Sequence, residues 1–460
     1  MPDGESEFVK LLYLSNGYPP LQRAGTEIYT AGIASAFARA GHAVEVVCTG
    51  DWTTGERAFN GVSRDRDGAV GLTRLHLNWA KGPDPNRRLY DNPQVEAVLD
   101  DYLDQTPPDL VHVTSCYTLS ASILRAVKRH RLPLAVTLTD FWFLCPRVTL
   151  LRADATLCTG RTTEWECLRC LLTDARAYRS LARLLPGGAV ARLLTWVSRR
   201  AWLSRRRGLR GMALDMGERK TTLPSLLQLA DVLIAPSHFL ADVYRANGVE
   251  GDIRVVPYGH DVSWVGEVTR RPTAGPLTFG FVGQIRAVKG LHVLAEALSH
   301  LSAAMPLRVD VWGDAQQDPD YVRTLPSLGP SHPPLRFRGS FTRTQLAEVF
   351  NQIDVLVVPS MWYENNPLVV QEAFAAGRPV VASQLGSLTE AVTHRVNGLL
   401  FERGNARALA DCLRQLTVQR ELVGRLQAGI PAVKTVQDEV VALTELYTTM
   451  LGQVMRTHIA

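Results

Sequence analysis

The sequence predicts an α/β protein with two doubly wound, Rossmann-like domains that face each other across a central cleft. Its 460 residues are too many for one ordinary core and suit two domains of about 200 residues each. Hydrophobic residues make up 46% of the chain and charged residues 21%, so both halves can bury a core. Strand and helix patterns alternate in the first half and restart in the second, as in parallel sheets covered by helices.

The first half begins with an apolar strand at residues 9–14, a loop that contains Gly25, and a helical pattern at 27–40. Gly41 ends this helix, and a second strand follows at 44–48. This succession is the start of a βαβ unit with parallel strands. The later elements predicted in this half are strands at 110–114, 134–139, 232–235 and 253–256, with helices through 123–128 and at 237–247.

The second half repeats the pattern after a segment at 261–276, which we interpret as a linker. Its predicted elements are strands at 277–282, 308–312, 354–358 and 379–382, with helices at 289–301 and 367–376. We expect the carboxyl ends of the strands of both sheets to line the cleft, where such folds bind ligands. The predicted domains are 1–262, with a helical insert at about 145–225, and 274–435, followed by a helix at 436–460 that packs back on one of them, the first in our interpretation.

Composition and charge exclude several classes of protein. The formal net charge is only +5, and no recognisable nucleic-acid module accompanies it, so we expect no nucleic-acid partner. The first ten residues lack the basic start and apolar stretch of a secretion signal, and no run approaches the ~20 apolar residues that cross a bilayer. We therefore expect a cytoplasmic protein, either soluble or peripheral on the inner face of the membrane.

The segment after the strand at 354–358 predicts an anion site. Asn366 suits the N-cap of the next helix, and Pro367 suits its first position, where the missing N–H costs nothing. The free N–H groups of Leu368 and Val369 then face the crevice at the positive end of the helix dipole. This arrangement suits a diphosphate group.

Two glutamates lie on either side of this cap. Glu364 precedes the cap in the loop, where it can accept hydrogen bonds from sugar hydroxyls. Glu372 lies about one and a half turns into the helix, where it can reach a ribose. Alternatively, both are solvated helix residues, which we would favour for an isolated pair. The Asn-Asn-Pro cap that begins at Asn365 favours the ligand site.

A second turn carries two cations where a helix dipole disfavours them. A strand ends at Gly283, and Arg286 and Lys289 follow at the predicted start of the next helix. Positive charge opposes the dipole there, so these side chains need another partner, and a bound diphosphate is such a partner. The alternative is that both are solvated surface cations.

Four of the seven cysteines lie close together, spaced by twelve, eight and two residues. In a reducing compartment they are not a disulfide framework. The closing Cys-Leu-Arg-Cys has knuckle spacing, and four thiolates suit a structural zinc ion, with an iron–sulfur cluster as the second choice. Alternatively, they are buried or unpaired thiols. The four are Cys145, Cys158, Cys167 and Cys170.

Residues 176–220 are strongly basic, with twelve Lys or Arg residues against Asp215 and Glu218. Tryptophans at 196 and 202 are interleaved with these charges. Basic residues with tryptophans at helical spacing suit an in-plane contact with anionic lipid. The alternative is a solvated helical hairpin that covers the domain.

These motifs together resemble those of the GT-B glycosyltransferases of family four. The Glu-x7-Glu signature of that family matches Glu364 and Glu372, and the Gly-x-Pro-Val-Val after it begins at Gly377. The Gly-x-x-Arg-x-x-Lys-Gly turn begins at Gly283. The resemblance covers nearly the whole chain, including Gly25-Thr-Glu27, Gly41-His42 and Ala-Pro-Ser at 235–237.

The resemblance implies a retaining glycosyltransferase that needs no catalytic metal. It would move a sugar from a nucleotide-diphosphate sugar to an unidentified acceptor, such as a lipid-linked acceptor or a cell-surface glycan precursor in polysaccharide biosynthesis. Charge stabilisation of the departing diphosphate would drive the reaction. Gly25 would let the first loop approach the phosphates from the opposite domain. The implied donor-binding residues are Gly25, Arg286, Lys289, Asn365, Asn366, Pro367, Leu368, Val369 and Glu372, and the implied catalytic residues are Glu364, Asp140 and Thr139.

One departure from the family pattern affects catalysis. Relatives often read Leu-His-Asp-Phe-Trp where this chain has Leu138-Thr139-Asp140-Phe-Trp, and the family's His would touch the donor sugar near the reacting carbon. Thr139 can donate a hydrogen bond but cannot carry positive charge. Either the sugar differs, or the enzyme is slow, or the chain is a non-catalytic sugar-nucleotide-binding partner of another glycosyltransferase. Asp140 remains for a polar contact.

Two other enzyme classes fit the sequence less well. The Glu-x7-Glu helix argues against a sugar-nucleotide epimerase of the GT-B fold. A Rossmann dehydrogenase is disfavoured because no Gly-x-Gly-x-x-Gly follows either opening strand.

Overall fold

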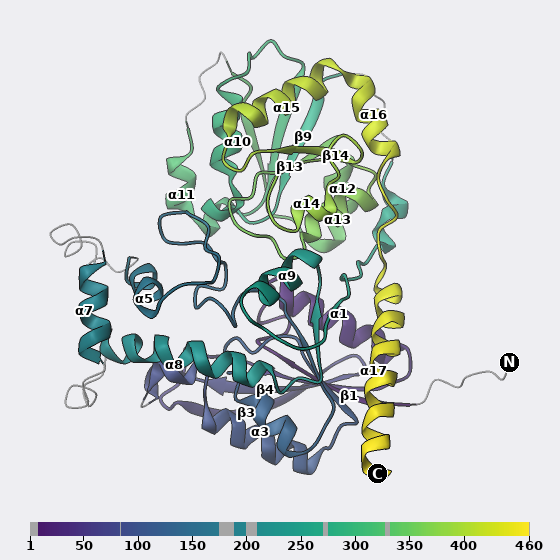
Figure 1. Cartoon of the computed structure of the whole chain (residues 1–460). Helices are drawn as coiled ribbons and strands as arrows, with labels where there is room; N and C mark the ends of the chain where they lie inside the picture. Colours follow the sequence, from purple (N-terminus) through teal and green to yellow (C-terminus); the bar gives the residue numbers. More distant parts are fainter. Residues whose placement is uncertain are drawn as a thin grey trace. The chain divides into compact units, whose positions relative to one another are not determined.

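The computed structural model in Figure 1 describes residues 8–82, 84–173, 188–198, 209–269, 275–326 and 332–459. The chain folds into two compact units. The first comprises residues 1–236, 240–257 and 436–460, and the second comprises 237–239 and 258–435. The first residues of the predicted linker lie in the second unit, where Trp264 is buried and stacks on Phe350. Residues 270–274 of that linker lie outside the described residues.

The first unit contains one mostly parallel sheet in the order β3-β4-β2-β1-β5-β6-β7-β8. The strands β3 and β4 form an antiparallel hairpin at one edge. This hairpin is missing from the sequence-based expectations, because β3 is exposed and rich in charged residues. The strands are β1 Lys10–Ser15, β2 Ala43–Thr49, β3 Phe59–Asp67, β4 Val70–Leu77, β5 Leu110–Val113, β6 Leu134–Thr137, β7 Val232–Ala235 and β8 Ile253–Val255.

Helices cover this sheet and form the predicted insert. The insert contains α5, α7 and α8, and Figure 1 shows α7 at the end of α8 that lies away from the sheet. These three helices bury a small core of their own around Leu168, Leu172, Ala191 and Met216. The helices are α1 Gly25–Arg39, η1 Trp79–Lys81, α2 Pro85–Arg88, α3 Pro93–Gln105, α4 Ile123–Arg129, α5 Glu164–Leu172, α7 Ala189–Ser198, α8 Leu209–Leu227, α9 His238–Ala246 and α17 Val436–Ile459.

The second unit contains a fully parallel sheet in the order β11-β10-β9-β12-β13-β14. Numbered within the unit, this is the Rossmann order 3-2-1-4-5-6. The order reverses between β9 and β12, so the loops that follow these two strands flank the topological switch point, where such sheets bind ligands. The strands are β9 Leu277–Val282, β10 Leu307–Trp312, β11 Leu335–Gly339, β12 Val355–Val358, β13 Val380–Ser383 and β14 Gly398–Phe401.

The same reversal occurs in the first unit between β1 and β5. The loop after β1 leads into α1 at Gly25. The predicted donor-binding residues thus lie beside the switch point of one unit or the other.

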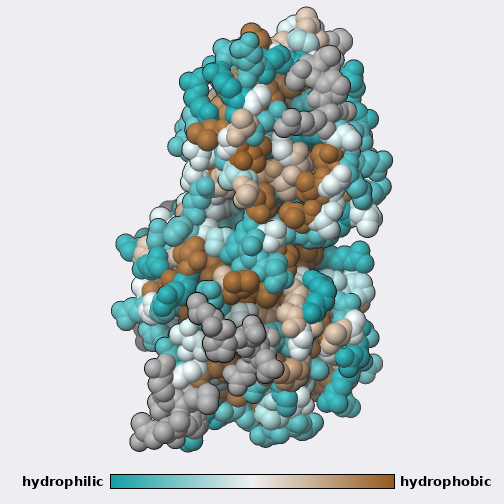
Figure 2. All heavy atoms as spheres, turned by 90° about the vertical axis from the view of Figure 1, so that its right-hand side faces the viewer, coloured by the Kyte–Doolittle hydropathy of each residue, from teal (hydrophilic) through white to brown (hydrophobic). Residues whose placement is uncertain are grey.

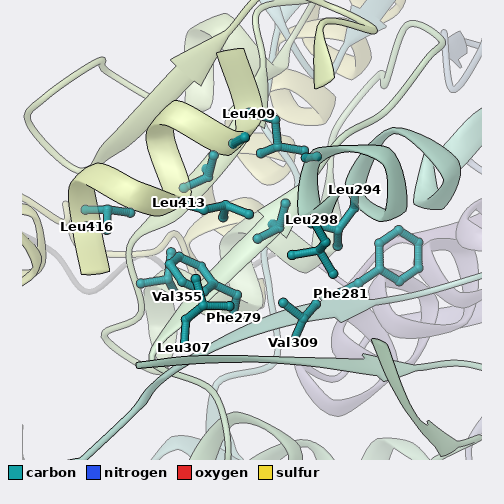
Figure 3. Close-up of a cluster of buried hydrophobic side chains, with 14 of the residues drawn as sticks. Phe279, Phe281, Leu294, Leu298, Leu307, Val309, Val355, Leu409, Leu413 and Leu416 are labelled. Atoms are coloured by element: carbon teal, nitrogen blue, oxygen red, sulfur yellow. The ribbon is translucent and has the colours of Figure 1, made fainter. Parts of the chain in front are cut away.

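The core of the second unit lies between its sheet and helices on both faces. The strands β9 and β12 are buried along their whole length, as expected for a parallel sheet that is covered on both sides. Figure 3 shows one face, where α10 and α15 pack on the strands through Phe279, Phe281, Leu294, Leu298, Leu307, Val309, Val355, Leu409, Leu413 and Leu416. The helices are η2 Ser263–Glu267, η3 Ala287–Lys289, α10 Leu291–Leu298, η4 Ala315–Gln317, α11 Pro319–Thr324, η5 Arg343–Gln345, α12 Leu346–Asn351, α13 Leu368–Ala375, α14 Leu388–Ala391, α15 Ala406–Val418 and α16 Arg420–Ala428.

The surface drawn in Figure 2 mixes polar and apolar residues. Within the described residues, every helix is too short or too polar to span a bilayer. The face in Figure 2 carries polar side chains, in teal, between smaller apolar patches, in brown.

The C-terminal helix α17 joins the first unit through buried polar contacts. The Tyr447 hydroxyl lies 2.6 Å from Nδ1 of His112 and 3.2 Å from the Tyr13 hydroxyl. Tyr29 donates a hydrogen bond of 2.9 Å to the buried carboxylate of Glu439. Burial lowers the pKa of His112 to about 3, so this histidine is neutral. The last helix is therefore tied into the core of the first unit.

We predict that Tyr447→Phe lowers the free energy of unfolding by about 1–3 kcal/mol, because it keeps the ring but leaves the buried Nδ1 of His112 without its partner. Urea denaturation at neutral pH measures this loss. Thr448→Ala, on the exposed side of the same helix, serves as the control. An equal loss in both variants would show that the buried network contributes nothing.

Candidate functional site

The first part of the site is the turn after β9. Gly283 follows the strand with φ 145°, a conformation that favours glycine. The chain then forms the 3-10 turn η3, and α10 begins only at Leu291. The prediction that Arg286 and Lys289 begin a long helix is therefore wrong, because Gly290 adopts a left-handed conformation that separates the turn from the helix.

Gly290 brings this turn against the end of β12. Its φ is 76°, and a Cβ atom at this position would lie 1.8 Å from the carbonyl oxygen of Pro359, so only glycine fits. Beside this contact, the Met361 N–H donates to the carbonyl of Val288 at 2.8 Å. The η3 turn is thereby fixed against the loop that leads to Glu364.

Glu364 is buried in this loop and holds Lys289. Its Oε1 accepts hydrogen bonds from Lys289 Nζ at 2.8 Å, Ser360 Oγ at 2.6 Å and Trp362 Nε1 at 2.9 Å. Burial works to raise the pKa of Glu364, but the Lys289 ammonium and the hydrogen bonds outweigh it and hold the pKa below its usual range. Glu364 is therefore ionised and fixed in place. The partner of Lys289 in this structure is a carboxylate, where the sequence predicted a diphosphate.

Arg286 has a different environment. It is exposed on the η3 turn, and its guanidinium has no carboxylate partner among the residues that the structure describes. This cation is therefore available to a ligand at the switch point.

The start of α13 differs from the prediction by one residue. The helix begins at Leu368, and Pro367 takes the N-cap position with φ −74°. The prediction that Asn366 caps the helix is wrong, because its side chain makes no cap and its Nδ2 is buried without an acceptor. In the described part of the chain, no acceptor meets the N–H groups of Leu368 and Val369, as at other helix starts. Asn365 is half-buried in the same loop.

Glu372 lies on α13 and faces a cation that the sequence analysis missed. Its carboxylate accepts a hydrogen bond of 3.2 Å from Arg343 Nη1. Burial raises the pKa of Glu372, and Arg343 offsets this only in part. Arg343 comes from η5, 29 residues away in the sequence, and no local pattern connects it with Glu372.

In the first unit, Gly25 is the first residue of α1 and lies at the switch point. A Cβ atom built on it would have nothing within 4 Å, so the helix start is open. The loop before it is held by buried Arg74, whose guanidinium donates to the carbonyls of Tyr18 at 3.1 Å and Pro19 at 2.9 Å. Arg74 thus fixes the loop through backbone groups.

Thr139 and Asp140 follow β6 and line a common pocket. The Asp140 carboxylate accepts a hydrogen bond of 2.7 Å from the Trp142 N–H. Burial raises the pKa of Asp140 to about 6, against the opposing effects of that N–H and of Arg219. This carboxyl group therefore changes its charge not far below neutral pH. The pocket is lined by Ser115, Cys116, Val136, Thr137, Thr139, Asp140, Trp142 and Phe143.

Glu27 is a further acidic residue near Asp140, which the sequence analysis noted only as part of a motif. It is 5% exposed, and its Oε1 accepts a hydrogen bond of 2.5 Å from Asn16 Nδ2. Its charge also contributes to the raised pKa of Asp140. The signal in the sequence was an acidic residue in the first turn of a helix that is otherwise apolar on one face.

The four clustered cysteines lie around one pocket, all as free thiols. Burial raises the pKa of Cys145 and Cys170. Within the described residues, however, no group of three or more His, Cys, Asp or Glu side chains is arranged to hold a metal ion. The predicted structural zinc site is therefore not formed in this structure, although Cys145, Cys158, Cys167 and Cys170 are brought together.

We predict that Lys289→Met lowers the free energy of unfolding by about 3 kcal/mol at pH 7, because it leaves the buried Glu364 charge without its partner. The pKa of Glu364 is depressed in the folded state, so the pair stabilises the fold above the ordinary Glu pKa of 4.5 and loses this effect as the pH falls through the folded-state pKa. The difference between wild type and variant should therefore shrink in acid. Urea denaturation across this pH range measures both effects.

The double variant Lys289→Met, Glu364→Gln is the control for this pair, because it removes both charges. It should recover much of the stability that the single variant loses. A double variant that is less stable than Lys289→Met would show that the ion pair is not what stabilises this loop.

Comparison with known proteins gives two matching family models. The model described as "Glycosyl transferase 4-like domain" matches residues 24–259, and the one described as "Glycosyl transferases group 1" matches residues 276–418. Among curated proteins, a D-inositol 3-phosphate glycosyltransferase of Xylanimonas cellulosilytica is 34% identical over 228 residues, which is 44% of this chain and 52% of the relative. A glycogen synthase of Mycobacterium tuberculosis is 31% identical over 169 residues, 36% of this chain and 40% of the relative. The chain spans about half the length of the D-inositol 3-phosphate glycosyltransferases that it matches.

Solved structures resemble the whole chain. Sucrose-phosphate synthase from Thermosynechococcus elongatus has a TM-score of 0.63 and 17% identity, with 96% of this chain and 100% of that chain covered. HepE of Anabaena, solved in complex with UDP-glucose, has a TM-score of 0.56 and 16% identity, with 98% and 99% covered. At these identities the likeness concerns the fold. The model described as "Glycosyl transferase 4-like domain" by itself matches just over half of the chain. The chain therefore belongs to the GT-B glycosyltransferases of family four.

Proposed function

We propose that this chain is a retaining glycosyltransferase that takes a sugar from a nucleotide-diphosphate sugar bound in the second unit. The observation that carries the proposal is the switch point between β9 and β12. The turn after β9 carries Arg286 and Lys289, and Lys289 binds Glu364 in the loop that leads from β12 to the free N–H groups of α13. Cations and helix N–H groups at such a point suit a diphosphate. HepE of Anabaena has been solved in complex with UDP and with UDP-glucose, so uridine donors are the first to test.

Each side chain has a role in this proposal. Arg286 and Lys289 stabilise the charge that develops on the departing diphosphate, so that this charge needs no catalytic metal. Glu364, held rigid by three donors, accepts hydrogen bonds from hydroxyls of the transferred sugar with its remaining lone pairs. Glu372 accepts a hydrogen bond from a ribose hydroxyl. This bond replaces part of the contact that Glu372 makes with Arg343.

The first unit supplies the acceptor side. A Cβ atom at Gly25 would meet nothing within 4 Å, so the start of α1 has room for a phosphate group, and we assign to Asp140 the polar contact that a histidine makes in relatives of the usual pattern. The acceptor hydroxyl attacks from the face that the diphosphate leaves, which retains the anomeric configuration. The acceptor is lipid-linked or a precursor of a cell-surface glycan. The second candidate function is that of a non-catalytic sugar-nucleotide-binding partner, because Thr139 replaces the histidine.

We expect one class among uridine, guanosine, adenosine and thymidine diphosphate sugars to raise the melting temperature of the protein. A donor at 100 times its dissociation constant should stabilise the fold by ~2.7 kcal/mol. The variant Arg286→Ala, Glu364→Ala should lose this shift. Arg336→Ala, which removes an exposed arginine on β11, should keep it. A shift that survives in the double variant would place the donor elsewhere.

Turnover separates the two candidate functions. An enzyme releases the nucleotide diphosphate and transfers the sugar, slowly to water or rapidly to an acceptor. Proton NMR of the glycosylated product should show the same anomeric configuration as the donor. A folded protein that binds the donor but never consumes it, across a broad panel of acceptors, would support the non-catalytic partner.

We further propose that helix α7 contacts an anionic membrane surface. Leu193 and Trp196 are 58% and 57% exposed on this helix, and Arg199 and Arg200 directly follow it in the sequence. Exposed apolar side chains next to arginines suit the boundary between headgroups and acyl chains. Arg199 and Arg200, like the basic residues at 174–187 and 201–208, lie outside the described residues.

We expect Leu193→Ser, Trp196→Ser to bind phosphatidylglycerol vesicles at least about tenfold more weakly than wild type, because two apolar anchors are lost. Vesicle co-sedimentation measures the binding. Val418→Ser, which changes an apolar side chain that is 71% exposed on α15, is the control. Equal binding by all three proteins, or equal binding to neutral phosphatidylcholine, would argue against the contact.

A further inference from the structure

The first unit contains a pocket whose wall is formed by four thiols. Cys145 and Cys158 come from the long loop after β6, and Cys167 and Cys170 come from α5. None of them forms a disulfide. Cysteine is otherwise scattered in this chain, at positions 48, 116 and 412.

Local structure explains why these thiols meet. The loop folds back on itself, with the Cys158 N–H donating to the carbonyl of Leu150 at 2.7 Å. Helix α5 begins with a capping box between Thr163 and Glu166, which fixes its first turn. Cys167 and Cys170 are three residues apart on this helix and so lie on the same face. The two loop cysteines and the two helix cysteines therefore border one space.

The surroundings of the pocket are positively charged. Arg147 and Arg152 line it together with the thiols. Arg219 of α8 is only 5% exposed and lies near Cys145 and Cys167. Its guanidinium donates to the Trp142 carbonyl and lies 5.3 Å from the centroid of the Trp142 ring. Among the described residues it forms no ion pair with a carboxylate.

A buried guanidinium without a carboxylate is costly unless negative charge lies nearby. The carboxyl group of Asp140 lies close enough to interact with Arg219, whereas four neutral thiols supply no negative charge. A divalent cation bound by four thiolates carries a net charge of −2, which positively charged arginines at the pocket would stabilise. The one carboxylate that lines the pocket, Glu166, is engaged in the capping box of α5.

We propose that Cys145, Cys158, Cys167 and Cys170 bind one soft divalent cation, with Zn²⁺ as the natural occupant. Among the described residues, no three such side chains are yet arranged to hold a metal ion. Binding therefore draws the loop and α5 together over the pocket that they already share. With four protein ligands the ion has no open coordination position, so it holds structure and takes no part in the transfer.

The segment that the ion would hold is the one that carries Asp140. Cys145 lies five residues after Asp140 in the sequence, and the Cys145 N–H donates to the carbonyl of Phe141 at 2.7 Å. Arg219 binds the carbonyl of Trp142 in the same segment. A metal on Cys145 thus tethers the Thr139–Asp140 pocket to α5 and α8. The ion is a positioning element for that pocket.

Metal analysis of the full chain tests this site without reference to any activity. Protein produced with zinc in the medium should contain about one zinc ion per chain. Cys158→Ser, Cys170→Ser should lose it, whereas Cys412→Ser, which changes a cysteine on α15 outside the pocket, should keep it. Zinc that remains in the double variant, or iron with sulfide in place of zinc, would overturn the proposal.

Cobalt uptake by the wild-type protein keeps the test decisive if the cysteine variant fails to fold. After removal of bound metal with a chelator, Co²⁺ should give the visible absorption of a tetrahedral thiolate site. The number of thiols that react with a disulfide reagent should rise on chelation and fall again on addition of Zn²⁺. Folded protein that contains no zinc and gives no tetrahedral cobalt spectrum would refute the site, whatever the outcome for the nucleotide sugar.

Discussion

The close approach of Gly290 to the carbonyl of Pro359 sets the geometry of the switch point in the second unit. Any Cβ atom at position 290 would lie 1.8 Å from that oxygen, so the contact exists only because the residue is glycine. It presses the turn after β9 against the loop after β12. Lys289 and Glu364, 75 residues apart in the sequence, form their ion pair across this contact. Arg286, on the same turn, has no carboxylate partner among the described residues.

This arrangement divides two cations between two tasks. Lys289 neutralises the buried carboxylate of Glu364, while Arg286 has no such duty in the part of the chain that the structure describes. Under the proposed function, a diphosphate that enters here meets one free cation and one that it shares with Glu364. The carboxylate stays rigid because Ser360 and Trp362 also hold it. Under the proposed function, the binding energy of the donor would therefore not be needed to fix the carboxylate that contacts the sugar.

Much of the fold was predictable, because short apolar strands alternate with helices and glycine ends several of them. The family resemblance and the two Rossmann-like sheets are confirmed. Helix starts were less predictable. Gly290 and Pro367 interrupt or delay helices through tertiary contacts and backbone conformation that local propensity does not include. The partners Ser360, Arg343 and Arg219 could not be found from the sequence, since each acts on a residue brought close by the fold. The cysteine spacing predicted proximity, which the structure shows, but not a formed metal site.

The most direct test of the central claim is a crystal structure of the protein with the nucleoside diphosphate of the donor class that it prefers. The account predicts that the diphosphate lies at the switch point of the second unit, in contact with Arg286, Lys289 and the N–H groups of Leu368 and Val369. It also predicts that Glu364 keeps its bonds to Ser360 and Trp362 while Lys289 turns toward the phosphate. A diphosphate bound away from the turn after β9, with Lys289 still confined to Glu364, would contradict it.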